Sequence, residues 1–163
     1  MDRYYLYPGK LFASKKPHVV DTILGSCVAV TLWDSVLNIG GINHYMLPKW
    51  NGEGKPSCKY GDVAIAELLK SMLDFGCERT NLKAKVFGGS ETGISNGFFY
   101  IGQRNIELAF DLLNKEQLTV VSNSVGGHMG RKVVFYSESG EVMVKNIGND
   151  TLEKSLGTEK RDL

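Results

Sequence analysis

Short runs of β-branched and apolar residues, separated by turns and loops rich in glycine, serine and aspartate, recur along most of this chain and restrict what it can fold into. Besides Val19 and Val20, the runs cover residues 28–33, 36–43, 84–87, 118–122, 133–136 and 141–145. Apolar runs of this length between turn residues are typical of strands. We therefore expect about seven or eight short strands, with a sharp bend at Leu24-Gly25-Ser26.

Helical periodicity occurs in only two segments. In the first, Asp62 is the expected N-cap and Gly76 the expected stop, with the apolar stripe Val63, Ala66, Leu69, Met72 and Leu73. In the second, residues 103–114, the stripe is Ile106, Ala109, Phe110 and Leu113. Two helices among many strands predict an α+β fold, a layered sandwich of mixed or antiparallel sheet rather than a doubly wound one.

The chain has 163 residues, which fits one compact domain over residues 1–163 with a polar tail at 148–163. Nineteen Lys and Arg nearly balance 18 Asp and Glu, so no overall field favours nucleic acid or a membrane surface. No segment resembles a signal peptide or approaches the ~18 apolar residues of a membrane span. We expect a cytoplasmic protein without membrane insertion.

The three cysteines are widely and irregularly spaced, without a CxxC pair or neighbouring histidines. This spacing argues against both a disulfide framework and a structural zinc site. The glycine pairs at 88–89 and 126–127 form neither GxGxxG nor a P-loop. We therefore expect no cofactor and no metal.

One cysteine occupies a position suited to a catalytic nucleophile. Cys27, in LGSCVAV, follows a turn and begins a strand, and His44, in GGINHYMLP, ends the predicted hairpin partner of that strand. A cysteine attacks as its thiolate, which a neighbouring histidine stabilises. The turn residues Gly25 and Ser26 bring backbone N–H groups near Cys27, where they can form an oxyanion hole.

The residues alone leave the role of Cys27 open. An isolated cysteine in an apolar strand is more often an inert small hydrophobe, and on general grounds that interpretation is favoured. If the pair is catalytic, Asp21 and Thr22 are candidates to orient His44. Of the remaining residues of the same types, Cys58 is expected to be an incidental surface thiol, Cys77 to pack in the core and His128 to be structural. His18 lies in a polar segment just before the first strand.

Several motifs in a fixed order resemble one family. They are LGSCVAVTLWD, Asn43-His44, Met46-Leu47-Pro48, KYGDVAI, KVFGGSE, IGQRNIE and VGGHMGRKVVF. Together, from about Lys10 to Lys145, they closely resemble CheD, the chemoreceptor glutamine deamidase of bacterial and archaeal chemotaxis. The combination is specific, and it shifts the balance towards catalysis.

The resemblance implies a cysteine hydrolase that converts receptor glutamine side chains to glutamate with release of ammonia, and glutamyl methyl ester hydrolysis as a second activity. The family's cysteine and histidine fall on Cys27 and His44. Its third catalytic position is a threonine, and this chain has Asp21 where some relatives have Thr, followed by Thr22; we prefer Thr22. The implied fold is similar to the cysteine-hydrolase domain of cytotoxic necrotizing factor toxins.

The implied partners are the helical cytoplasmic domains of chemoreceptors and, in organisms that have it, the phosphatase CheC. Loops 49–60 and 90–100 are candidates for the rim that receives a receptor helix, with Trp50, Tyr60, Phe98 and Phe99. Arg131 and Lys132 are candidates to meet acidic groups, although a cationic strand end is commonly just exposed. Two alternatives remain: a regulatory binding module for receptors or CheC with little turnover, and a thiol hydrolase of small amides.

Overall fold

The computed structural model describes residues 1–91 and 100–148. Within these ranges the chain forms nine strands, two α-helices and a short 3₁₀ turn, Arg79–Asn81. The predicted rim aromatics Phe98 and Phe99 lie outside the described residues, as does the predicted tail beyond Gly148. No helix in the described ranges is long and apolar enough to cross a membrane.

Two mixed sheets form two of the three layers. The first has the order β1-β3-β8-β9, with bounds Asp2–Tyr5, His18–Leu24, Gly130–Tyr136 and Val142–Ile147. The second has the order β2-β5-β4-β6-β7, with bounds Lys10–Ser14, Ile39–His44, Val28–Asp34, Leu82–Gly88 and Thr119–Val125. Only β1 with β3 and β6 with β7 pair in parallel; all other neighbours are antiparallel.

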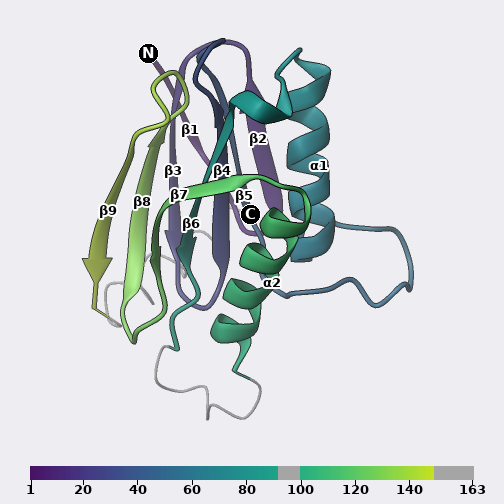
Figure 1. Cartoon of the computed structure of the whole chain (residues 1–163). Helices are drawn as coiled ribbons and strands as arrows, with labels where there is room; N and C mark the ends of the chain where they lie inside the picture. Colours follow the sequence, from purple (N-terminus) through teal and green to yellow (C-terminus); the bar gives the residue numbers. More distant parts are fainter. Residues whose placement is uncertain (92–99, 149–163) are drawn as a thin grey trace.

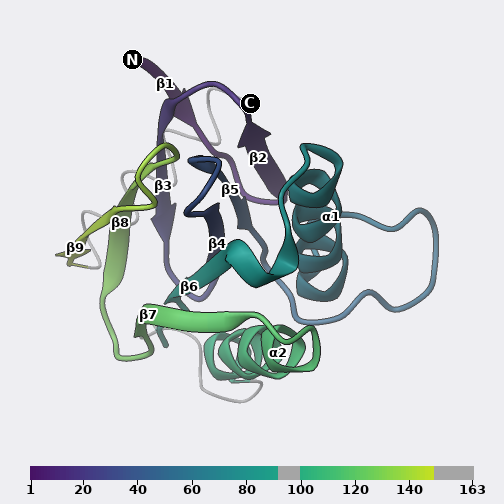
Figure 2. The same ribbon diagram turned by 45° about the horizontal axis from the view of Figure 1, so that its top comes forward.

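Both helices cover the outer face of the second sheet and form the third layer (Figures 1 and 2). They are α1, Gly61–Asp74, and α2, Ile101–Lys115. One apolar cluster lies between these helices and the second sheet, and includes Val30, Leu68 and Leu113. The other lies between the two sheets, and includes Ala29 and Phe135. The central strands β4, β5 and β6 are therefore largely buried on both faces, whereas the edge strand β7 is mostly exposed.

The α+β class with two helices is confirmed, and the local boundaries differ from those expected. The strands β1 and β2 were not predicted, because each is a short run whose pairing partner lies elsewhere in the chain. Asp62 was wrong as the N-cap of α1: the cap is Tyr60, and the Asp62 carboxylate instead accepts from the Trp50 and Val63 N–H groups. Gly76, with φ of +98°, follows the end of α1 as expected.

Candidate active site

The predicted site residues gather at one end of the sandwich, the lower end in Figure 1. The strand β3 ends there at Leu24, β4 begins at Val28, β5 ends at His44 and β6 ends at Gly88. Antiparallel pairing of β4 with both β5 and β6 brings the start of one strand beside the ends of its neighbours. The bend at Gly25-Ser26 thus places Cys27 next to the last residue of β5.

Strand alternation puts Cys27 and His44 on the same face of the sheet. Val28 and Tyr45 exchange two backbone hydrogen bonds, of 3.1 and 2.9 Å, and point towards the helices. Cys27 and Ala29 therefore point the other way, into the cluster between the sheets. In this register His44 lies opposite Ala29 and diagonal to Cys27, a relationship of about 7–8 Å between Cα atoms.

The imidazole of His44 is held by Thr22. The Thr22 Oγ1 lies 2.7 Å from His44 Nδ1 and donates its single proton to the Leu6 carbonyl, at 2.8 Å. With that proton engaged, Oγ1 can only accept from His44, so the proton of the neutral imidazole is on Nδ1. The lone pair of His44 is therefore on Nε2, the atom that a general base needs.

His44 Nε2 is buried and has no hydrogen-bond partner among the described residues. The ring is 1 % exposed, and this burial lowers the pKa of His44 from 6.5 to about 3. Burial disfavours the charged imidazolium, and no neighbouring carboxylate in the described chain offsets this penalty. The resting histidine is therefore neutral at physiological pH and able to accept a proton.

The Cys27 thiol is also neutral in the resting site. Burial raises the pKa of Cys27 from 9.0 to about 12, and its own backbone N–H offsets a smaller part of that rise. Sγ makes no hydrogen bond to His44, whose Nε2 is unpartnered. A neutral thiol beside a neutral imidazole means that proton transfer must accompany nucleophilic attack rather than precede it.

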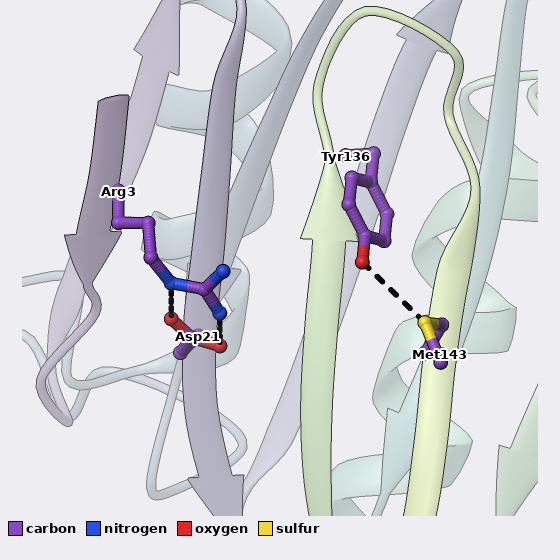
Figure 3. A network of polar contacts seen from close by, with 4 residues as sticks. All are labelled: Arg3, Asp21, Tyr136 and Met143. Carbon is purple, nitrogen blue, oxygen red and sulfur yellow. Dashed lines mark hydrogen bonds and ion pairs between the residues drawn. The ribbon is translucent and has the colours of Figure 1, made fainter. Parts of the chain in front are cut away.

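Asp21 points away from His44. Its carboxylate accepts two hydrogen bonds from Arg3 on the neighbouring strand β1, at 2.7 and 3.1 Å; the pair is drawn in Figure 3. The same close-up shows the Tyr136 hydroxyl donating to the Met143 sulfur between β8 and β9, at 3.4 Å. Because successive residues of a strand face opposite sides, Asp21 and Thr22 cannot both face the site. The structure brings Thr22, and not Asp21, into contact with His44.

The carbonyl groups of the Cys27 loop are all occupied. Gly25 O accepts from both the N–H and the hydroxyl of Ser90, each at 3.0 Å. Ser26 O accepts from the Asn105 side chain at 3.0 Å, and Cys27 O accepts from Gly89 N–H at 2.8 Å. The N–H groups of Ser26 and Cys27, in contrast, donate to no other described residue, and the Cys27 N–H faces its own sulfur. Both N–H groups therefore remain available to a ligand of the Cys27 loop.

Sequence reasoning missed Ser90 and Asn105, which are both fully buried. Asn105 occupies a core-facing position of α2, since its neighbours in the same stripe, Gly102, Ile106 and Ala109, are buried as well. A polar residue within an apolar helical stripe was the available signal. Ser90 gave no comparable signal, because it follows Gly88-Gly89 in a segment that was expected to be a loop.

The other candidates lie away from Cys27 or have structural contacts. His18 begins β3 at the far end, where its ring packs on Phe12 and bonds the Lys16 carbonyl. The His128 ring bonds the Glu91 carbonyl in the exposed loop before β8. Cys77 is buried and Cys58 half-buried, and both are free thiols.

The residues expected at the rim and the expected basic residues differ in their contacts and in their exposure to solvent. Trp50 is tied to its own loop, with Nε1 donating to Glu53 O at 3.0 Å, and Tyr60 caps α1. Lys132 is exposed, but Arg131 is only 7 % exposed and bonds the Ser124 hydroxyl and the Gly126 carbonyl, at 3.1 and 2.7 Å. Arg131 thus stabilises the loop between β7 and β8.

Comparison with known proteins gives the family. The family model described as CheD chemotactic sensory transduction matches residues 46–146. The probable chemoreceptor glutamine deamidase CheD of Sulfurimonas denitrificans is 41% identical over 90% of this chain and 95% of its own length. Its counterpart in Trichlorobacter lovleyi is 43% identical over 87% of this chain and 89% of its own length, and one in Rhodospirillum rubrum is 38% identical over 90% and 84%. With more than half of the chain matched and relatives similar over nearly their full length, this chain belongs to the CheD family.

Proposed function

We propose that this protein is a cysteine-dependent deamidase that converts glutamine side chains of chemoreceptors to glutamate. The relatives are named as probable chemoreceptor glutamine deamidases. The observation that carries the assignment of catalytic residues is the bond between Thr22 and His44 Nδ1, because it leaves Nε2 unprotonated on the face shared with Cys27. In this proposal Cys27 is the nucleophile, His44 the base and acid, and Thr22 the group that orients it.

The first half-reaction releases ammonia. The Cys27 sulfur attacks the carbonyl carbon of the glutamine side chain while its proton passes to His44 Nε2. The carbonyl oxygen becomes negatively charged and accepts from the N–H groups of Ser26 and Cys27. The C–N bond then breaks, the leaving nitrogen takes the proton from His44, and a thioester remains on Cys27.

The second half-reaction restores the enzyme. A water molecule gives a proton to His44 Nε2 and its oxygen attacks the thioester carbonyl. The C–S bond breaks, the proton returns to the sulfur, and glutamate leaves. The sum is one glutamine side chain and one water giving glutamate and ammonium, since the released ammonia takes up the proton of the new carboxyl group. A glutamyl methyl ester differs only in releasing methanol in the first step, so we propose ester hydrolysis as a second activity of the same residues.

We further propose that residues 1–163 act as one CheD domain, with 148–163 as a tail, and that the layered fold is similar to the cysteine-hydrolase domain of cytotoxic necrotizing factors. Support comes from the three layers with the thiol at one end of the sandwich. A protein that acts on receptor cytoplasmic domains works in the cytoplasm, and CheC is its proposed second partner where it is present.

The test is mass spectrometry of a glutamine-containing receptor cytoplasmic domain incubated with wild type, Cys27→Ala or Cys58→Ala, together with ammonia release. Cys58 is the matched control, a free thiol that packs against the cluster between the helices and the second sheet rather than between the two sheets. We expect site-specific conversion by wild type and Cys58→Ala, and none by Cys27→Ala although it still binds the receptor. Conversion by Cys27→Ala would refute the mechanism. Receptor or CheC binding by wild type without any conversion would instead identify a regulatory binding module, and turnover of free glutamine would identify a small-amide hydrolase.

A further inference from the structure

Asn105 connects the two chain segments that carry the thiol and the imidazole. Its side-chain amide donates to Ser26 O, directly before Cys27, and to Met46 O, two residues after His44, each at 3.0 Å. The backbone carbonyl of Asn105 accepts from the Tyr45 hydroxyl at 2.6 Å. One residue of α2 thus binds both sides of the site, at sequence separations of 79 and 59 residues.

The bond to Ser26 O also sets the direction of the Cys27 N–H. In a trans peptide the C=O of one residue and the N–H of the next point in opposite directions within one rigid plane. Because Asn105 holds Ser26 O towards α2, the Cys27 N–H must point away from α2. Ser90 acts in the same way one peptide earlier, since its two bonds to Gly25 O direct the Ser26 N–H.

We propose, on the basis of the deamidase function above, that Asn105 is a positioning residue that presets the oxyanion hole. Together with Ser90, it orients the N–H groups of Ser26 and Cys27 for the oxygen that becomes charged during attack. Within residues 1–91 and 100–148 neither N–H donates to another residue, as expected of donors kept for a ligand. Donors fixed in advance stabilise the charge without reorganising during the reaction.

Asparagine suits this position because its amide has two N–H donors on one short side chain. A carboxylate of the same shape would offer only acceptors to two carbonyl oxygens. The first turn of the helix that carries Asn105 packs directly against the Gly89 backbone, since a Cβ on Gly102 would collide with it.

The experiment compares Asn105→Ala with Asn114→Ala, a matched change at an exposed position of α2. We measure kcat and KM for receptor deamidation, and separately the rate at which iodoacetamide alkylates Cys27. Alkylation needs the thiol but creates no oxyanion. We expect Asn105→Ala to lower kcat about 30- to 100-fold, with KM and the alkylation rate within about twofold of wild type and Asn114→Ala unchanged.

Two results would overturn the proposal. One is an unchanged kcat in Asn105→Ala; the other is an alkylation rate that falls in parallel with kcat, which would mean that the residue only maintains the local structure. If Asn105→Ala does not fold, Ser90→Ala takes its place, since it removes one of two bonds to Gly25 O. Ser90→Ala should lower kcat about three- to tenfold while the alkylation rate stays constant. An unchanged kcat in this variant would refute the proposal.

A second substrate separates this inference from the proposed function. Hydrolysis of p-nitrophenyl acetate at Cys27 also passes through an oxyanion but needs no receptor. Suppose that wild type hydrolyses this ester but does not deamidate receptors, and that Asn105→Ala loses the ester hydrolysis. This result would refute the receptor function while supporting the role of Asn105. Equal ester hydrolysis by wild type and Asn105→Ala would refute the role of Asn105 and leave the deamidase function standing.

Discussion

The Thr22 hydroxyl lies 2.7 Å from Nδ1 of His44 and, because it donates to Leu6 O, can only accept from that nitrogen. A neutral threonine thus does what a carboxylate does in many triads, fixing the tautomer and the ring orientation. It does so without supplying a charge, which is why burial alone sets the low pKa of His44.

Replacing Thr22 by valine should lower kcat about 100-fold, because the shape remains while Nδ1 loses its acceptor and the imidazole can change tautomer. Thr22→Ser keeps the hydroxyl and should stay within about tenfold of wild type. Steady-state deamidation of a receptor domain measures both. Equal activity of the valine and serine variants would show that the hydroxyl has no role.

Asp21→Asn should leave kcat within about twofold of wild type, because the Asp21 carboxylate pairs with Arg3 on the outer side of β3. Steady-state deamidation of a receptor domain measures this as well, with Thr22→Val as the variant that is expected to lose activity. A loss in Asp21→Asn as large as in Thr22→Val would contradict the division of roles between these two neighbours.

The free energy of unfolding should fall as the pH drops below 6.5, because the folded protein keeps His44 neutral down to about pH 3 while the unfolded chain binds a proton. Between pH 7 and 5 this difference amounts to about 2 kcal/mol. In His44→Gln that part of the pH dependence should disappear. Urea unfolding of both proteins at several pH values measures the change, and identical slopes would contradict it.

The pH profile of kcat/KM should be flat between about pH 5 and 9. The free enzyme needs neutral His44, present above its pKa of about 3, and protonated Cys27, present below its pKa of about 12. An ion-pair mechanism would instead show an acid limb near the ordinary histidine pKa of 6.5. Initial rates at low receptor concentration across this range distinguish the two cases.

Gly88→Ala should destabilise the protein far more than Gly126→Ala. Both glycines have positive φ, +102° and +79°, so both variants carry about 1 kcal/mol of backbone strain. A Cβ at Gly88 would also collide with the Cys27 carbonyl, whereas Gly126 faces open space. We expect a total of about 3 kcal/mol or more at Gly88 in urea unfolding, with lower kcat as the Cys27 loop is displaced. Similar effects at both positions would show that the loop adapts.

Local pattern was sufficient for both helices, for the strands from β3 to β9 and for the approximate place of the thiol, but not for β1 and β2. The β-branched runs, the two helical stripes and the turn before Cys27 all depend on neighbours within a few residues, so they can be recognised in the sequence. A predicted strand that ran from Val19 to Leu24 would also have placed Thr22 on the buried side with Val20 and Leu24, and Asp21 on the other side.

The sequence by itself determined the α+β class, the position of Cys27 at the start of a strand and of His44 at the end of the next, and the motifs shared with CheD proteins. Only the tertiary structure decided that β1 brings Leu6 to Thr22, and that Ser90 and Asn105 hold the carbonyls of the Cys27 loop. These bonds join residues 16, 65 and 79 positions apart. Such contacts depend on strand register and on the packing of α2 against the sheet, and no local periodicity encodes them.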